Sequence, residues 1–161
     1  MSHVVWRIAA DTATYPADDL SGNGARATGG RWNARGQAVV YASTTRALAC
    51  LETVVHLNAG GLPLNRYLVE ISIPAAVWKA ARRETAGGLP VGWDAEPASL
   101  TSVGFGGAWV AGMRSAVLVV PSVVVPEEFN VLINPGHPGA EGIACRKVRK
   151  WVFDGRLLQG R

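Results

Sequence analysis

A carboxylate stands in the middle of an apolar segment of the sequence. Residues 47–57 read ALACLETVVHL, so Glu52 would be desolvated by its neighbours unless it is paired or faces a cavity. His56 follows four residues later, about 40° away on the same face of a helix, so the two side chains can share one polar notch. Two interpretations stay open here: a charged group that does chemistry in a cavity, and a glutamate–histidine hydrogen bond on a half-exposed helix.

Arg31 lies in the segment GGRWN, whose glycines would let the backbone come close to a ligand. Its guanidinium suits bidentate binding of a phosphate or a carboxylate. The structural alternative is an ion pair with a buried acid such as Glu52 itself. The neighbouring segment GNGARATGG is a weak phosphate-loop candidate, because it contains neither GxxxxGK[ST] nor a GxGxxG between a strand and a helix.

Other polar residues have structural explanations beside chemical ones. Tyr41 ends an apolar run, where an aromatic ring is more often part of the core. Ser122 lies in VVPSVVVPEEFN and needs a hydrogen-bond partner, but the absence of a GxSxG motif makes a serine hydrolase a poor interpretation. Asn134 and His137 belong to NVLINPGHP, whose Asn-Pro and His-Pro pairs indicate a turn. The histidines and cysteines lack metal-ligand spacing, so we expect no metal.

Short elements must position these residues, because glycine and proline punctuate the whole chain. We predict strands over residues 3–9, 38–42, 65–73, 116–125 with an interruption at Pro121, 131–133 and 147–153, and a loop between the first strand and GGRWN. We predict helices over residues 45–58, 77–85 and 98–113. The first helix would be capped by Ser43 or Thr44, ended by Gly60 and Gly61, and largely buried because it is apolar nearly all round. Strands without regular βαβ alternation indicate the α+β class.

Composition favours one globular domain, since 48% of the 161 residues are hydrophobic and 17% are charged. The net charge is +4, but residues 146–161 hold six Lys or Arg and one Asp, so the basicity belongs to the tail and the body is nearly neutral. We expect the tail to be a charged edge strand and a frayed terminus. The sequence shows no signal peptide or membrane span, so we expect a cytoplasmic protein in which Cys50 and Cys145 are reduced.

Four segments in order, WRI, GGRWNARGQAVVYAS, ALACLETVVHL and PSVVVPEEFNVLINPGHP, resemble the RES domain family, whose members are toxins of bacterial toxin–antitoxin pairs. The resemblance covers residues 4–138 of a single domain over 1–161, with a basic strand and tail at 144–161. It implies an α+β fold similar to ADP-ribosyltransferase toxins, with a split, twisted sheet and flanking helices around an NAD-binding cleft.

The resemblance also implies roles for individual residues. The family's Glu, Arg and Ser correspond to Glu52, Arg31 and Ser122, and Tyr41 falls where related enzymes place an aromatic ring near nicotinamide. Arg7 and Asn134 match further cleft positions. The expected catalytic set is Glu52, Arg31, Tyr41 and Ser122, and the expected NAD-binding set is Arg7, Arg31, Tyr41 and Asn134. Glu52 would stabilise the oxocarbenium-like transition state, and Ser122 would orient Glu52 and bind ribose or phosphate.

NAD would then be consumed as a substrate. We expect its degradation by water or phosphate, which would deplete the cell of NAD and arrest growth; the alternative is an ADP-ribosyltransferase that modifies a bacterial protein. An interpretation from another class is a basic RNA-cleaving toxin with His56 and His137 as its acid–base pair. The family context implies an antitoxin with an Xre-like helix-turn-helix region that covers the cleft. DNA would be bound only through that antitoxin, membranes would not be partners, and a homo-oligomer within the complex is left open.

Overall fold

One mixed sheet of seven strands forms the framework of the molecule. In a computed structural model of the chain, the structure describes residues 1–57 and 63–158. Their strands are β1 Ser2–Ala10, β2 Val40–Ser43, β3 Arg66–Pro74, β4 Arg82–Arg83, β5 Val117–Pro121, β6 Phe129–Ile133 and β7 Ala144–Lys150. The order across the sheet is β4-β5-β6-β2-β1-β3-β7, and only the β4–β5 pair is parallel. The chain is therefore a single α+β domain, as predicted.

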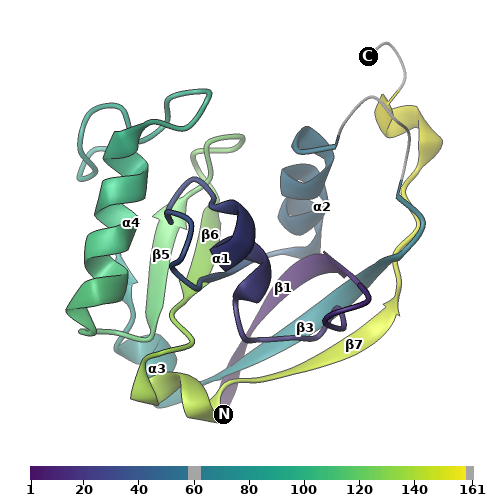
Figure 1. The fold of residues 1–161 in the computed structure, drawn as a ribbon, viewed down its shortest axis with the longest axis horizontal. Coiled ribbons are helices and arrows are strands. Elements are labelled where there is room, and N and C mark those ends of the chain that lie inside the picture. The colour runs from purple at the N-terminus through teal and green to yellow at the C-terminus, as the bar shows by residue number, and fades with distance from the viewer. Residues whose placement is uncertain (58–62, 159–161) are drawn as a thin grey trace.

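The sheet consists of two halves joined at one point. β1 and β3 are paired along their whole length, from Ser2 opposite Pro74 to Ala10 opposite Arg66. By contrast, β1 and β2 share a single register position, Trp6 opposite Ser43. Figure 1 shows the consequence: β5 and β6 run in a different direction from β1, β3 and β7. The half β4-β5-β6-β2 and the half β1-β3-β7 thus diverge from a common junction.

Within the described ranges, four helices and two 3₁₀ segments accompany the sheet: α1 Asn23–Thr28, α2 Arg46–Val55, α3 Ala75–Lys79, α4 Leu100–Gly112, η1 Pro138–Gly142 and η2 Gly155–Leu158. α4 packs beside β5, and α2 stands over the end of β1 (Figure 1). α1 lies in the segment predicted to be a loop, where it follows Gly22 in the left-handed conformation with φ of 72°. A side chain at Gly22 would also meet the backbone of Val39 at 2.8 Å.

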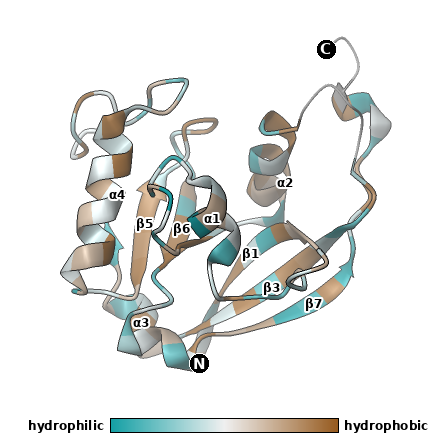
Figure 2. Cartoon of the chain, in the orientation of Figure 1, coloured by the Kyte–Doolittle hydropathy of each residue, from teal (hydrophilic) through white to brown (hydrophobic). Residues whose placement is uncertain are grey.

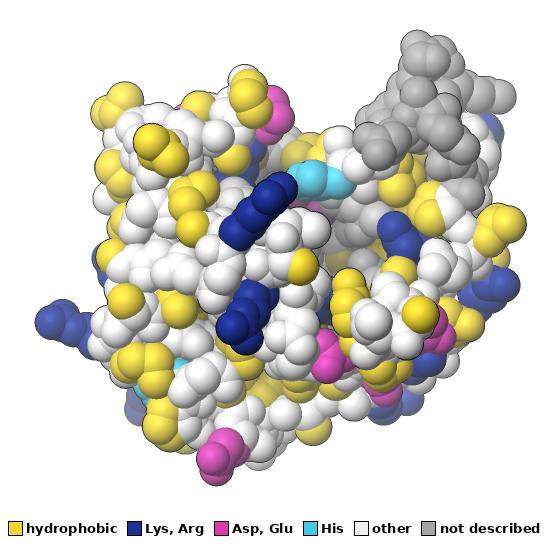
Figure 3. All heavy atoms as spheres, viewed as in Figure 1, with side chains coloured by type: hydrophobic (Ala, Val, Ile, Leu, Met, Phe, Trp, Pro, Cys, Tyr) yellow, Lys and Arg dark blue, Asp and Glu magenta, His cyan; other side chains and the backbone are white. Residues whose placement is uncertain are grey.

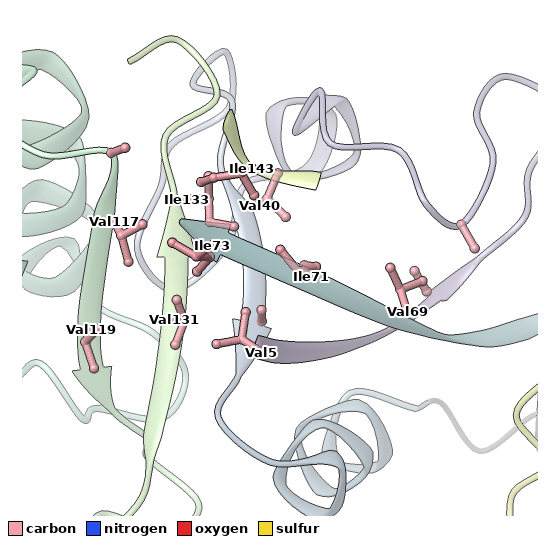
Figure 4. Close-up of a cluster of buried hydrophobic side chains, with 14 residues drawn as sticks. Val5, Val40, Val69, Ile71, Ile73, Val117, Val119, Val131, Ile133 and Ile143 are labelled. Carbon is pink, nitrogen blue, oxygen red and sulfur yellow. The ribbon is translucent and has the colours of Figure 1, made fainter. Parts of the chain in front are cut away.

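The core occupies both faces of β5 and β6. Val117 and Val119 of β5 join one cluster with valines and isoleucines of β1, β3 and β6 (Figure 4), whereas Leu118 and Val120 join a second cluster with Trp32 and Trp109. This alternation follows from the two-residue period of a strand. It explains why β5 is hydrophobic along its length in Figure 2, while β7 is largely hydrophilic. Full burial of each Val or Ile contributes about 1.5–3 kcal/mol before entropy losses.

The structure corrects several predicted boundaries. α2 begins after Thr45, whose side chain accepts a hydrogen bond from the Leu48 amide, so the predicted caps Ser43 and Thr44 are wrong. α2 ends at Val55 with His56 as its C-cap, so the predicted extension to Asn58 is wrong; the predicted terminators Gly60 and Gly61 lie outside the described residues. α2 is also not buried all round: its buried residues are Leu48, Ala49 and Val54, and Val55 is 42% exposed. One side of this apolar helix therefore faces a cavity or solvent.

Two further segments differ from their predictions. The helix predicted over 77–85 is divided into the short α3 and the two-residue strand β4, because Arg82 and Arg83 pair with β5. The strand predicted to continue to residue 125 ends at Pro121. There the hydroxyl of Ser122 accepts hydrogen bonds from the amides of Val124 and Val125, so these amides are used in a turn and not in a ladder.

The basic strand β7 forms one edge of the sheet, as predicted for a charged edge strand. It also holds the loop that follows β1. Lys147 Nζ lies 2.9 Å from both carboxylate oxygens of Asp11, and Cys145 Sγ donates to the carbonyl of Asp18 at 2.8 Å. Cys50 and Cys145 are both free thiols. Among residues 1–57 and 63–158, none of the helices has the length and apolar character needed to cross a membrane.

Candidate functional site

A cavity of about 480 Å³ lies at the junction of the two half-sheets. Its walls come from β1, the loop after it, α1, the GGRWN turn, β2 and α2. The volume falls within the range of ligand-binding pockets, roughly 300–1,000 Å³. Four of the predicted site residues line this cavity: Arg7, Arg31, Tyr41 and Glu52.

Glu52 is held by one of its two carboxylate oxygens. Its Oε1 accepts hydrogen bonds from Ser122 Oγ at 2.6 Å and from Asn130 Nδ2 at 2.8 Å. The other oxygen, Oε2, has no hydrogen-bond partner within residues 1–57 and 63–158. These two hydrogen bonds to Oε1 offset the cost of removing the carboxylate from water among its apolar neighbours. Its second oxygen is left for a ligand in the cavity.

Ser122 lies behind Glu52 and not in the cavity wall. Its side chain is fully buried, and its hydroxyl donates to Glu52 while it accepts from the amides of Val124 and Val125 at 3.1 Å each. All the hydrogen-bonding capacity of a hydroxyl is used in this way. The structure therefore brings Ser122 to Glu52, as the orienting role requires, but leaves it no free group for ribose or phosphate.

Asn130 and Ser43 complete the support of Glu52, although neither was predicted to belong to the site and Ser43 was expected only as a possible helix cap. The two residues are directly opposite each other in the β2–β6 ladder. Ser43 Oγ donates to Asn130 Oδ1 at 2.7 Å, which turns the amide so that its Nδ2 donates to Glu52. The available signal was two polar residues at the ends of adjacent apolar runs, but their pairing depends on strand register that one sequence does not specify.

Arg31 sits in a tight turn closed by backbone hydrogen bonds between Gly30 and Asn33. Its Nη1 donates to the carbonyls of Trp93 at 3.2 Å and Ala95 at 2.7 Å, and its Nη2 lies 2.7 Å from Glu96 Oε2. The ion pair considered for Arg31 is therefore formed with an exposed acid from another loop, and not with Glu52. Arg31 lines the cavity and at the same time ties residues 93–96 to it.

Tyr41 stabilises the same turn through two hydrogen bonds of its hydroxyl group. Its hydroxyl donates to Asn33 Oδ1 at 2.6 Å and accepts from the Trp32 amide at 3.1 Å. Burial raises the pKa of Tyr41 well above its usual value of 10.0, so the hydroxyl stays protonated and continues to donate. A side chain at Gly30 would lie 2.8 Å from this hydroxyl, so only glycine fits there. The ring of Tyr41 forms part of the cavity wall.

Arg7 is a partly buried cation of the cavity whose charge is only partly offset by its surroundings. It lies between Val5 and Ala9 on one face of β1, among apolar neighbours. Within the described ranges its guanidinium forms no hydrogen bond or ion pair. Burial lowers the pKa of Arg7, and the negative charge of Asp19 partly offsets this effect. Since arginine remains charged in proteins, the cavity contains an unpaired positive charge.

The two histidines that were considered as an acid–base pair lie in different places. His56 lines the cavity, but its Nδ1 donates to the backbone carbonyl of Glu52 at 2.7 Å, so the Glu–His side-chain hydrogen bond is not formed. His137 accepts from the Gly139 amide at 2.9 Å and does not line the cavity. The structure therefore does not bring the two histidines together.

Asn134 is also outside the cavity wall. Its side chain is 3% exposed, donates to the Val110 carbonyl at 3.1 Å and accepts from the Gly136 amide at 3.0 Å. It thereby connects α4 to the turn after β6, and the structure gives it no path to a bound cofactor.

Neither a cluster of metal-ligating residues in the described part of the chain nor a continuous basic patch on the face shown in Figure 3 accompanies the cavity. Residues 1–57 and 63–158 contain no group of three or more His, Cys, Asp and Glu residues that could hold a metal ion. On the face shown in Figure 3, Lys and Arg side chains are scattered and do not form one continuous patch. The chemistry of the cavity therefore rests on one half-anchored carboxylate, one unpaired guanidinium and one arginine fixed in a turn.

Comparison with known proteins identifies the family of this chain. A sequence model of the RES domain matches residues 4–154. The chain belongs to the RES domain family. A protein of Sphingobium sp. (strain YBL2) named Prs ADP-ribosylating toxin is 63% identical to this RES domain over 159 residues, 99% of each chain. Proteins named Toxin Res from Yersinia enterocolitica and Pseudomonas putida are 33% and 35% identical, over 89% and 96% of this chain and 93% and 99% of their own. The predicted family resemblance is confirmed.

Proposed function

We propose that this RES domain is a toxin that cleaves the nicotinamide–ribose bond of NAD and transfers ADP-ribose to a protein. The observation that carries the proposal is the cavity itself, in which Glu52 keeps one free carboxylate oxygen and Arg7 an unpaired guanidinium. The relative that is 63% identical is named an ADP-ribosylating toxin, which favours transfer to a protein over the expected NAD degradation. The two divergent half-sheets support the ADP-ribosyltransferase-like fold that the sequence suggested.

The proposed chemistry needs an anion beside the ribose. When the bond between C1′ and the pyridinium nitrogen breaks, its electron pair goes to nicotinamide, which leaves as a neutral molecule, and positive charge develops on the ribose. A preorganised carboxylate stabilises that charge most strongly in the transition state. Oε2 of Glu52 would do this, while Ser122 and Asn130 hold Oε1 in place. The acceptor then forms the new bond to C1′ and releases its proton.

The other residues of the cavity would bind the rest of NAD. Arg7 would neutralise the pyrophosphate, because a partly buried guanidinium without an ion pair gains most from an anion. The ring of Tyr41 would pack against nicotinamide. Arg31 would keep the GGRWN turn and residues 93–96 in position beside the cofactor. No protein acid is required at the leaving group, since nicotinamide departs without protonation.

The Glu52→Gln variant tests this proposal, because it preserves shape and the hydrogen bonds to one oxygen but removes the charge. The name of the relative that is 63% identical makes Prs the candidate acceptor protein. The wild type and the variant are incubated with NAD, with and without purified Prs, and with and without phosphate. Mass spectrometry separates ADP-ribosylated protein, free ADP-ribose and ADP-ribose phosphate. We expect modified Prs from the wild type and a loss of at least about 10²-fold in the variant. NAD consumption by the variant at the wild-type rate would contradict the mechanism, and free ADP-ribose alone would favour hydrolysis.

We also propose that an antitoxin with an Xre-like helix-turn-helix region neutralises this RES domain by covering the cavity, and that the complex binds DNA through the antitoxin. Support comes from the family membership and from the open cavity, which a partner segment would have to close. Co-purification of the Glu52→Gln variant with the product of a neighbouring reading frame tests this. A complex that still consumes NAD when formed by the wild type would contradict it.

A further inference from the structure

The loop after β1 brings a second acid to the cavity. Asp19 lies in the segment that joins β1 to α1, and it lines the cavity together with Arg7. One of its carboxylate oxygens, Oδ2, accepts hydrogen bonds from the amide of Ser21 at 3.2 Å and from the hydroxyl of the same residue. The other oxygen, Oδ1, forms no hydrogen bond or ion pair with the described residues. Asp19 is therefore held by one oxygen and can bind a ligand with the other.

Asp19 and Glu52 approach the cavity from opposite faces of β1. α2, which carries Glu52, packs against the face of β1 that contains Trp6. The loop that carries Asp19 packs through Ala17 against the opposite face, which contains Ala9. β1 pairs with β2 at a single register position, and beyond that position β1 borders the cavity. One ligand can therefore pass around this edge of β1 and reach both carboxylates.

Arg7 projects from the same face of β1 as the loop of Asp19. Burial lowers the pKa of Arg7, and the negative charge of Asp19 opposes that effect, so the two charged groups act on each other. The two described side chains nevertheless form no ion pair. Opposite charges that share a cavity without contact suit a ligand in which an anion is next to hydroxyl donors. The adenosine half of NAD has this order, since its pyrophosphate is attached to a ribose with free 2′- and 3′-hydroxyls.

We propose that Asp19 binds the 2′-hydroxyl of the adenosine ribose and thereby makes this RES domain specific for NAD over NADP. A free carboxylate oxygen accepts a strong hydrogen bond from that hydroxyl, as an acidic residue does in other dinucleotide-binding folds. In NADP the same position carries a phosphate, which lacks the hydroxyl donor and is repelled by the charge of Asp19. Glu52 would then serve the nicotinamide ribose and Asp19 the adenosine ribose, with the pyrophosphate beside Arg7. The inference rests on the proposed function, since it concerns which dinucleotide enters that reaction.

The test compares nicotinamide release from NAD and from NADP by the full chain. Reactions contain purified Prs and phosphate, so that protein, phosphate and water are all available as acceptors, and kcat/KM is measured for each dinucleotide. The Asp19→Asn variant removes the charge but keeps a side-chain oxygen that can accept from Ser21, so the local turn is preserved. The matched control is Asp18→Asn, which removes the same charge one residue earlier and outside the cavity wall. A third substrate, NAD with 2′-deoxyadenosine in place of adenosine, isolates the contribution of the hydroxyl.

We expect the wild type and Asp18→Asn to prefer NAD over NADP by at least about 10²-fold in kcat/KM, and Asp19→Asn to lower this preference by at least about tenfold. Loss of the 2′-hydroxyl from the substrate should lower kcat/KM by at least about fivefold in the wild type and change it little in Asp19→Asn.

Three results would overturn the role of Asp19 alone: equal use of NAD and NADP by the wild type, an unchanged preference in Asp19→Asn, or a loss of preference that Asp18→Asn shares. If the wild type releases nicotinamide from neither dinucleotide, the proposed function fails together with this inference.

Discussion

Gly106 of α4 packs directly against the turn that carries Arg31. A Cβ atom at this position would lie 1.8 Å from the Trp32 carbonyl oxygen and 2.7 Å from its carbonyl carbon. Ordinary van der Waals contact begins at 3.4 Å, so α4 or the turn must move by about 1.6 Å to admit a methyl group. Both partners in this contact are backbone, and neither can rotate away. The Gly106→Ala substitution is therefore a local test of how tightly α4 supports the site.

The magnitude follows from two opposing effects. Overpacking of this kind costs about 1–3 kcal/mol, while replacing glycine by alanine inside a helix gains about 1 kcal/mol. The difference is a fall of about 0–2 kcal/mol in the free energy of unfolding, and the contact with backbone places it near the upper end of that range. The displaced turn includes the Trp32 amide that binds Tyr41, and Arg31 precedes it by one residue. Since a misplacement of about 1 Å costs on the order of 10²-fold in rate, NAD turnover should fall by up to that factor.

Gly104→Ala provides the matched control two residues earlier on the same helix. No atom lies within 4 Å of a Cβ placed there, so this variant should gain up to about 1 kcal/mol of stability and keep its turnover. Urea unfolding and NAD consumption are measured for both variants. If Gly106→Ala unfolds at the same urea concentration as Gly104→Ala and consumes NAD at the wild-type rate, the packing argument is wrong.

Two other predictions concern the support of Glu52 and of the loop after β1. Ser122→Ala removes one of the two donors to Glu52 Oε1, so we expect kcat for NAD to fall about 10–100-fold with a smaller change in KM; unchanged kcat would show that Asn130 alone suffices. The hydrogen bond from Lys147 is the main cause that lowers the pKa of Asp11 below its usual 3.8. The ionised Asp11 carboxylate therefore stabilises the folded protein above pH 3.8, and this stabilisation is lost as the pH falls through the pKa that Asp11 has in the folded state. Asp11→Asn should therefore lower the urea midpoint at pH 7 but not in solutions well below pH 3.8; an equal difference at both pH values would contradict this assignment.

The sequence was informative where local pattern determines structure. The strands over residues 3–9 and 65–73 could be predicted because β-branched and apolar residues cluster between turn signals, and Glu52 was conspicuous because no neighbour could solvate it. What compensates Glu52 could not be predicted in full. Its second donor, Asn130, is 78 residues away, and the orientation of that amide is set by a third residue in another strand. Such contacts depend on strand register and on the path of α2 over the sheet.

The roles of the two arginines in the cavity could not be separated from sequence either. Both were expected to bind NAD, but the structure gives Arg31 three partners on residues 93–96 and leaves Arg7 without a hydrogen bond or ion pair among the described residues. A partly buried guanidinium without an ion pair destabilises the empty protein, so an anion bound beside Arg7 would stabilise the folded state. The charge of Arg31 is already balanced by the Trp93 and Ala95 carbonyls and by Glu96. In the proposed reaction, Arg7 therefore supplies affinity for the pyrophosphate, whereas Arg31 holds residues 93–96 beside the cavity in which the Glu52 carboxylate lies.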